Sequence, residues 1–246
     1  DLRQEIINYA REQGVDLIGF ASADKWNEVN EVPADFRPKA IWSKTKTVIV
    51  LGIAMPLPII ETTPSLMHTE TYNTCNRELD KTAFNLMRYL NRKGYASIFF
   101  PRDAFGNIEI LKQNPMAAFS HKAAAKYAGL GNIGLSHNLL TPEFGPRVRF
   151  VSVFTSVELE PDKMIEKDLC IKCLACAQFC PVNALLPKED TIIADYDLKA
   201  CIDEHSRLVK KRCYPCGICI KVCPVGADRK LYNQPGIMTK YRKEIE

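Results

Sequence analysis

Apolar residues recur at helical spacing in three segments of the chain. The segment 2–13 places them three and four positions apart and is followed by a glycine, which predicts a helix that ends there. Residues 72–94 show the same period and also end on a glycine. A third helix is expected over 119–129, with Ser120 as its N-cap and Gly129 as its stop.

Four apolar runs rich in β-branched and aromatic residues predict strands, at residues 15–22, 47–55, 95–101 and 147–159. The second run is apolar almost throughout, as expected of a strand buried on both faces. The order βα and then βαβ, with a late hairpin of antiparallel character, favours an α+β sheet domain. A tight doubly wound parallel sheet fits this order less well.

Cysteines are concentrated in the last third of the chain. Of ten, only Cys75 precedes Cys170. Two runs, CIKCLACAQFCP from Cys170 and CYPCGICIKVCP from Cys213, repeat gaps of two, two and three residues, and a proline follows the last cysteine of each. This is the bacterial pattern for [4Fe–4S] ligation, in which the fourth cysteine of each run ligates the other cluster.

The crossed pattern assigns a ligand set to each cluster. Cluster I takes Cys170, Cys173, Cys176 and Cys223, and cluster II takes Cys180, Cys213, Cys216 and Cys219. Three thiolates from one tight loop can bind three corners of a cubane. Zinc sites pair C-x2-C knuckles without a third cysteine two residues on. A disulfide scaffold is typical of secreted chains, and no signal peptide is seen here.

Composition sets outer bounds. The 246 residues, 46% of them hydrophobic, are enough for a full core and for one or two domains. The net charge of +4 gives no reason to expect a nucleic-acid partner. No signal-peptide pattern and no apolar run of about 18 residues is present, so we expect a cytoplasmic protein without a membrane partner. The many cluster thiolates imply a reducing, anaerobic setting.

The motif GLGNIG contains three glycines, Gly129, Gly131 and Gly134, which satisfy G-x-G-x-x-G. The dinucleotide fingerprint needs a strand before this motif, whereas a predicted helix precedes it here. Two interpretations remain: a helix end that needs positive φ, or a close approach of the backbone to another group.

The run FSHKAAAKYAGLGNIGLSHNLLTPEFGPRVRFVSVFTSVEL, followed at once by the cysteine repeat, resembles the epoxyqueuosine reductase family and, more distantly, the corrinoid reductive dehalogenases. Those proteins share a helix ending in A-G-L-G-x-x-G, a T-P-x-x-G-x-x-x-R segment, a strand and a double-cluster module. ETYNTCNRELDKTAFNLMRYLNRKGY looks like the family's central helix. The resemblance covers roughly residues 40–225 and is strongest over 119–225.

This resemblance implies a nitroreductase-like, cobalamin-binding sheet domain at 1–160 and a bacterial-ferredoxin-like double [4Fe–4S] domain at 161–246. It implies a base-off cobalamin reduced by the nearer cluster, with a low-potential ferredoxin or flavodoxin as the external donor. Carried over by position, the cofactor-binding residues are Ser120, His121, Gly129, Leu130, Gly131, Gly134, His137, Thr141, Pro142 and Arg149.

The chain departs from the epoxyqueuosine reductases at their catalytic residue. Their D-S-x-P segment carries a catalytic Asp, but the matching stretch here is QNPMAAF, with Pro115 or Met116 in its place. The family's C-terminal helical repeats, which serve the tRNA substrate, have no counterpart before Glu246. We therefore assign no catalytic residue and do not expect tRNA reduction. Tyr72 and Tyr127 are conceivable proton donors, although aromatic residues on helix faces more often belong to the core.

The second cysteine run raises another departure. In the reductases this run lacks its first cysteine, and a cysteine some 12–15 residues earlier replaces it. This chain has both, Cys201 and Cys213. Completion of the ferredoxin repeat favours Cys213, which would leave Cys201 as a buried apolar filler.

Two functions from different classes follow. In the first, the protein is an oxidoreductase that passes electrons through two [4Fe–4S] clusters to a bound corrinoid and reduces an unknown substrate. In the second, it is an electron-transfer protein, a ferredoxin fused to a docking or flavin-binding domain, without substrate chemistry of its own. Cobalt bound together with iron would favour the first.

Overall fold

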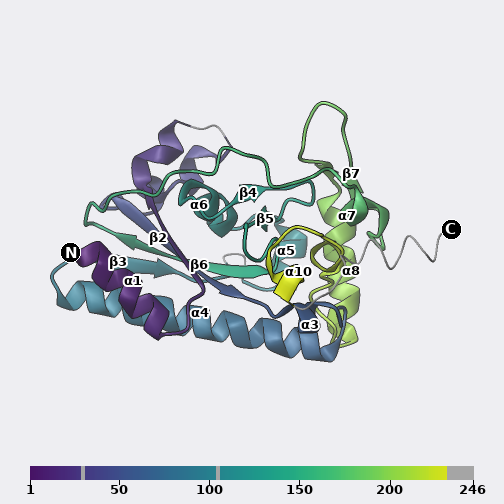
Figure 1. The fold of residues 1–246 in the computed structure, drawn as a ribbon, viewed down its shortest axis with the longest axis horizontal. Helices are drawn as coiled ribbons and strands as arrows, with labels where there is room; N and C mark the ends of the chain where they lie inside the picture. Colours follow the sequence, from purple (N-terminus) through teal and green to yellow (C-terminus); the bar gives the residue numbers. More distant parts are fainter. Residues whose placement is uncertain (29–30, 104–105, 232–246) are drawn as a thin grey trace.

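A computed structural model describes residues 1–28, 31–103 and 106–231 (Figure 1). At its centre lies a sheet with the strand order β1 (Leu17–Ser22), β2 (Thr47–Ala54), β6 (Val148–Thr155) and β3 (Ser97–Phe100). Every neighbouring pair in this sheet is antiparallel. The fold is therefore mixed α and β, and the sheet is not of the doubly wound parallel kind.

Helices cover both faces of the sheet, because successive strand residues point to opposite sides. On one face, the long helix α4 (Leu66–Arg92) and α1 (Leu2–Glu12) bury apolar side chains against β2 and β6. Leu79 and Leu86 of α4 are fully buried there together with Val151 of β6.

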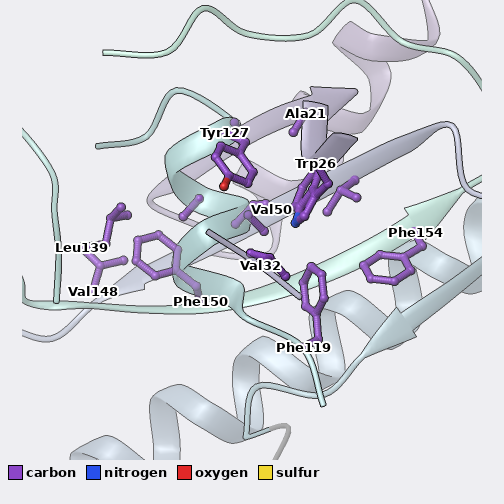
Figure 2. Packing of buried hydrophobic residues seen from close by; sticks show 14 residues of the cluster. Ala21, Trp26, Val32, Val50, Phe119, Tyr127, Leu139, Val148, Phe150 and Phe154 are labelled. Carbon is purple, nitrogen blue, oxygen red and sulfur yellow. The ribbon is translucent and has the colours of Figure 1, made fainter. Parts of the chain in front are cut away.

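The short helix α6 (His121–Tyr127) lies on the opposite face, over a second apolar cluster (Figure 2). The Trp26 ring lies edge-on to Tyr127 with centroids 4.8 Å apart, and Phe119 lies edge-on to Phe154 at 4.9 Å. This packing fixes the start of α6, and with it the position of the glycine motif that follows.

The four strands and the three helices predicted from periodicity are present. Their bounds agree within a few residues, except that α4 begins at Leu66, before the expected start. Its N-cap is Ser65, whose hydroxyl accepts the His68 N–H at 3.1 Å. None of the helices in the described ranges is both long and apolar enough to cross a membrane.

The remaining elements are short, apart from α8. They are η1 (Ala23–Asn27), η2 (Ala34–Phe36), α2 (Pro38–Ile41), α3 (Leu57–Ile60), α5 (Ile108–Gln113), β4 (Asn132–Ile133), β5 (Leu139–Leu140), α7 (Ala175–Gln178), β7 (Leu185–Leu186), β8 (Asp195–Tyr196), α8 (Leu198–Lys210), α9 (Ile218–Lys221) and α10 (Asp228–Leu231). The strands β4 and β5 form one hairpin and β7 and β8 another.

The two cysteine runs form similar local structures. Each contains a one-turn helix, α7 or α9, that follows a residue with positive φ, Leu174 at 62° and Gly217 at 69°. The two helices pack on each other through Ala175 and Val222. The two halves of the sequence repeat therefore fold alike and pack against each other.

Candidate metal centres

The four cysteines predicted for cluster I lie around one cavity. The cavity is small and partly open to solvent. The lining residues are Leu135, Ser136, Leu140, Cys170, Ile171, Lys172, Cys173, Leu174, Cys176, Cys223, Pro224 and Val225. Three of the four thiols come from the loop before and within α7, and the fourth comes from the end of the second run.

The surroundings of these thiols disfavour thiolates whose charge is not balanced. Burial, with added repulsion from neighbouring thiolates, raises the pKa of Cys176 to about 12 and that of Cys223 to about 11. Thiolates so close together in an apolar cavity are disfavoured unless a cation balances their charge. The cavity therefore fits an iron–sulfur cluster chemically.

A second group contains Cys180, Cys201, Cys216 and Cys219. Burial raises the pKa of Cys216, with smaller contributions that include those of Cys201 and Cys180. Burial also raises the pKa of Cys219 to about 12, with a smaller contribution from Cys201. Burial raises the pKa of the Cys201 thiol as well.

Cys213, which the repeat favoured as the fourth member, makes a contact of its own. Its Sγ lies 3.2 Å from the carbonyl oxygen of Lys211. Cys201 lies in the first turn of α8, whereas Cys213 lies beyond the end of the helix. The interactions of Cys201 with Cys216 and Cys219 make it a candidate for the fourth ligand beside Cys213, which stays the prediction from the repeat.

The segment 134–140, which contains the turn between β4 and β5, borders both cysteine groups. Leu135 packs against Cys170, Cys176 and Cys219. The side-chain amide of Asn138 donates to Cys219 Sγ at 3.4 Å. Figure 1 shows β4 and β5 between the sheet and the elements α7 and α8.

The glycines of GLGNIG approach the chain's own backbone. A Cβ atom at Gly129, where φ is +71°, would lie 2.3 Å from the Lys163 carbonyl oxygen. One at Gly131 would lie 2.0 Å from the carbonyl oxygen of Leu140. One at Gly134 would lie 2.7 Å from the Leu140 side chain and 3.6 Å from Cys170 Cβ. The motif follows α6 rather than a strand, and its close approaches hold the wall of the cluster I cavity in place.

Several other residues expected at a cofactor have partners within the protein. Ser120 caps α6, accepting the Ala123 N–H at 3.2 Å. His121 contacts Ser152 Oγ through Nδ1 at 2.9 Å and the Pro101 carbonyl through Nε2 at 2.8 Å, and burial lowers its pKa to about 4. Both ring nitrogens of this neutral histidine are therefore occupied.

His137 and the segment after it contact the cysteine-bearing region. The His137 ring stacks on Tyr196 at 4.9 Å, and its Nε2 lies 2.8 Å from the Ala194 carbonyl oxygen. Thr141 is fully buried in a turn, and the Pro142 carbonyl accepts the Ala227 N–H at 3.0 Å. Leu130 packs against the apolar cluster beneath α6.

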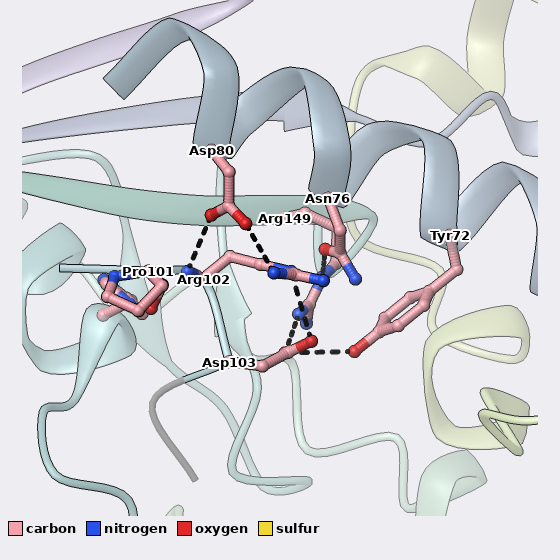
Figure 3. A network of polar contacts seen from close by, with 8 residues as sticks. Tyr72, Asn76, Asp80, Pro101, Arg102, Asp103 and Arg149 are labelled. Atoms are coloured by element: carbon pink, nitrogen blue, oxygen red, sulfur yellow. Dashed lines mark hydrogen bonds and ion pairs between the residues drawn. The ribbon is translucent and has the colours of Figure 1, made fainter. Parts of the chain in front are cut away.

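Arg149 belongs to a polar network that the sequence gave no reason to expect (Figure 3). Its Nη2 donates to Asp103 Oδ1 at 2.8 Å and its Nε to Asn76 Oδ1 at 3.0 Å. The Tyr72 hydroxyl donates to the same Asp103 oxygen at 3.3 Å, and the guanidinium lies 4.4 Å from the centre of the Tyr72 ring. Burial raises the pKa of Tyr72, so the phenol keeps its proton.

Lys122 connects this network with the second cysteine group. Its side chain is exposed, although the surrounding protein desolvates the ammonium and lowers its pKa. Cys219, Cys201 and Arg149 all act on its charge. The ammonium donates to the His137 carbonyl at 2.7 Å. We call the recess bordered by Lys122, Arg149 and Cys219 the polar recess.

A buried ion pair attaches the second cysteine run to the sheet. The Arg147 side chain is fully buried and donates to both oxygens of Asp228, at 2.7 and 2.6 Å. It also donates to the carbonyls of Cys223 and Val225, at 3.2 and 2.6 Å. No local pattern pointed to this contact, because Arg147 and Asp228 lie far apart in the sequence.

Thr63 and His68 form a second attachment that sequence reasoning missed. The Thr63 hydroxyl donates to the Cys216 carbonyl at 2.7 Å and lies 2.8 Å from His68 Nδ1. Because the hydroxyl hydrogen is used on the carbonyl, the histidine is the donor in the second bond. This pair fixes the loop that carries Cys216 against the start of α4.

Comparison with known proteins agrees with the resemblance seen in the sequence. Residues 169–227 match the 4Fe-4S dicluster domain family. The chain is 25% identical over 263 residues to the epoxyqueuosine reductase of Bacillus anthracis, with 95% of this chain and 67% of that protein covered. It is 28% identical over 225 residues to a tetrachloroethene reductive dehalogenase of Desulfitobacterium hafniense, with 85% and 36% covered.

A solved reductive dehalogenase, whose structure suggests a mechanism for B12-dependent dehalogenation, has the same fold. It superposes with a TM-score of 0.67 at 20% identity, over 93% of this chain and 33% of that one. The predicted relationship to both groups of reductases is confirmed. The chain spans 67% of the Bacillus anthracis reductase but only 36% of the Desulfitobacterium hafniense dehalogenase.

Proposed function

We propose that this protein is an iron–sulfur reductase that passes electrons through two [4Fe–4S] clusters toward the polar recess, where a bound corrinoid and an as yet undefined substrate react. The observation that carries the proposal is the position of the polar recess. It lies beside the second cysteine group and next to the buried Tyr72, whose hydroxyl is the proposed source of the proton. Electrons and protons would thus meet at one place.

The proposed ligand sets differ at one position from those expected of the repeat. Cluster I is bound by Cys170, Cys173, Cys176 and Cys223, and cluster II by Cys180, Cys201, Cys216 and Cys219. The grouping of these thiols around one cavity and around one another supports the assignment. In this scheme Cys213 is a free thiol.

Cluster I is the proposed point at which electrons enter. Its cavity is partly open, and Ile171 in its wall is 67% exposed. A low-potential ferredoxin or flavodoxin in a reducing, cytoplasmic setting would be the donor. The division into a cofactor-binding domain, 1–160, and a double-cluster domain, 161–246, assigns one step to each part of the chain.

The residues around the polar recess suit a corrin in chemical type. Lys122, Arg149 and the side-chain amide of Asn76 present donors, and the buried Asn76 Nδ2 has no partner among the described residues. Such donors match the amide fringe of a corrin. When bound, cobalamin supplies a low-valent cobalt, which is a strong nucleophile or reductant. In this arrangement the glycine motif supports the clusters and does not contact the corrin.

Tyr72 is the proposed proton donor. No carboxylate stands where the related epoxyqueuosine reductases carry their catalytic Asp, but Tyr72, Asp103 and Arg149 form a connected group. Asp103 orients the phenol, and the Arg149 guanidinium would stabilise the tyrosinate left after proton transfer. Reprotonation from solvent would complete the cycle.

Metal analysis of the anaerobically purified protein tests the proposal. We expect about eight iron atoms and eight acid-labile sulfides per chain, as two [4Fe–4S] clusters require, together with about one cobalt. Iron near eight without cobalt, even after incubation with cobalamin, would support the electron-transfer protein instead. Zinc in place of iron would contradict both functions.

A further inference from the structure

We propose that Arg229 supplies the buried positive charge that balances cluster I, next to its ligand Cys223. This inference rests on the proposed function, because it requires cluster I to be present. It goes further by giving one buried cation, to which no role has been assigned so far, a part in the stability and the reduction potential of that cluster.

Two guanidinium groups meet at the backbone of Cys223. Arg229 Nε donates to the Cys223 carbonyl oxygen at 2.8 Å, and Arg147 Nη1 donates to the same oxygen at 3.2 Å. Arg229 Nη2 also donates to the Lys221 carbonyl oxygen at 2.6 Å. Both arginines are buried. Two buried cations therefore lie at the residue whose thiol is the fourth proposed ligand of cluster I.

These two cations share one carboxylate in contact. Asp228 accepts hydrogen bonds from Arg147 Nε at 2.7 Å and from Arg147 Nη2 at 2.6 Å, so it balances the charge of Arg147. The hydrogen bonds that Arg229 makes within the described ranges go to carbonyl oxygens, which carry no net charge. Glu61 also acts on the charge of Arg229, but more weakly than Asp228 does. The pair of arginines thus carries a net positive charge at Cys223.

Arg229 also has a donor that is not used. Its Nη1 is buried and has no hydrogen-bond partner in the part of the chain that the structure describes. A buried guanidinium N–H without an acceptor is costly. The sulfurs of a [4Fe–4S] cluster are anionic acceptors, and hydrogen bonds between charged groups are the strong ones. The chemistry of Arg229 therefore fits an anion bound through Cys223.

The two cysteine runs differ in the residues that follow their last cysteine. The first run continues as PVNALL and the second as PVGADR, so Asp228 and Arg229 replace the two leucines of the first run. Leu185, the counterpart of Asp228, is buried in an apolar cluster. The charged pair is thus a feature of the second run, from which cluster I takes Cys223.

The sign of the expected effect follows from charge. An all-cysteine [4Fe–4S] cluster is an anion in both redox states, and reduction adds one further negative charge. A buried cation beside it stabilises the reduced state more than the oxidised state, and so raises the reduction potential. Removal of the Arg229 charge should therefore lower the potential of cluster I. Removal of the Asp228 charge should raise it, because two cations are then left unbalanced.

The test is an anaerobic potentiometric titration of the holoprotein, followed by EPR, with iron analysis of each sample. Arg229→Gln removes the charge and keeps a hydrogen-bond donor, whereas Arg229→Lys keeps the charge. Lys230→Gln removes an exposed positive charge from the next residue and is the matched control. We expect the potential of cluster I to fall in Arg229→Gln and to stay near the wild-type value in Arg229→Lys and Lys230→Gln.

Two further variants complete the experiment. Asp228→Asn should raise the potential of cluster I, and a purely structural role would not shift the potential in opposite directions at neighbouring residues. The signal missing from Cys216→Ser identifies cluster II, because Cys216 belongs to that cluster in both ligand assignments. The potential of cluster II is the internal control and should not move in the Arg229 and Asp228 variants.

The outcomes separate this inference from the function beneath it. About eight irons per chain with an unchanged potential of cluster I in both Arg229→Gln and Asp228→Asn would overturn the inference and leave the proposed function intact. A fall in both variants, or loss of cluster I in Arg229→Lys as well as in Arg229→Gln, would make these residues structural supports and would also overturn it. A wild-type protein without two clusters would remove the proposed function itself.

Discussion

The two proposed cluster sites share one spacing of cysteines and a trailing proline, yet their surroundings are unlike. The site of cluster I uses the ligands that the repeat assigns and has an apolar wall that is partly open to solvent. In the proposal, cluster II takes Cys201 from α8 as its fourth thiol, and the Asn138 amide donates to its ligand Cys219. A repeat of ligands is therefore not a repeat of function.

Such a difference between the two sites would let electrons pass through a ferredoxin-like unit in one direction. The residues that distinguish the sites come mostly from outside the repeat: from the turn between β4 and β5 and from α8. The added sheet region thus provides a recess and also makes the two clusters inequivalent.

The largest expected effect concerns the fourth ligand of cluster II. Cys201→Ser should lower the iron content from about eight to about four per chain, because a cubane needs all four thiolates for stable binding. Cys213→Ser is the matched control and should retain about eight. Iron and sulfide analysis of both variants measures the effect. Loss of iron in Cys213→Ser but not in Cys201→Ser would show that Cys213 is the fourth ligand of cluster II.

The second largest effect is expected on turnover, through the proposed proton donor Tyr72. Tyr72→Phe removes the proposed proton donor and should slow turnover by about 10²- to 10⁴-fold, the usual contribution of general acid catalysis. The measurement uses reduced viologen as donor with tetrachloroethene and a small epoxide, on whichever the wild type reduces. Tyr127→Phe is the control, since that hydroxyl contacts Glu31 outside the network. An unchanged rate in Tyr72→Phe would exclude the phenol.

A third effect should appear on the side of cluster I. Arg147→Leu leaves Asp228 charged and buried, and should lower the free energy of unfolding by about 3–5 kcal/mol. The double variant Arg147→Leu with Asp228→Leu should recover much of this loss, because no charge is then left unpaired. Anaerobic urea denaturation measures both. Equal stability of the single and double variants would show that the pair is not energetically coupled.

The smallest effect should spare both clusters. Burial lowers the pKa of His121 to about 4, below the 6.5 of an exposed histidine. Between these two pH values the histidine is neutral in the folded protein and protonated in the unfolded chain. Its contribution to stability is present above pH 6.5 and is lost as the pH falls toward 4. The slope from this group approaches about 1.4 kcal/mol per pH unit. His121→Gln should flatten the decline in urea midpoint between pH 6.5 and 5, with iron content unchanged; an equal slope would contradict the assignment.

Local patterns in the sequence carried a large part of the structure. The helix and strand predictions succeeded because period and caps are set by neighbouring residues, and cluster I followed from gaps within two short runs. The place of Cys201 could not be read in this way, since it depends on how α8 packs. The same holds for the contact of Tyr72 with Asp103 and for that of Arg147 with Asp228. The glycine motif indicated a close approach to the backbone. It did not identify the approaching groups, which are the carbonyl groups of Leu140 and Lys163.

The metal content of the wild-type protein tests the account most directly. Analysis after anaerobic purification and incubation with cobalamin gives the iron, sulfide and cobalt bound per chain. The account predicts about eight irons, about eight sulfides and about one cobalt. About eight irons without cobalt would contradict the proposed passage of electrons to a corrinoid at the polar recess.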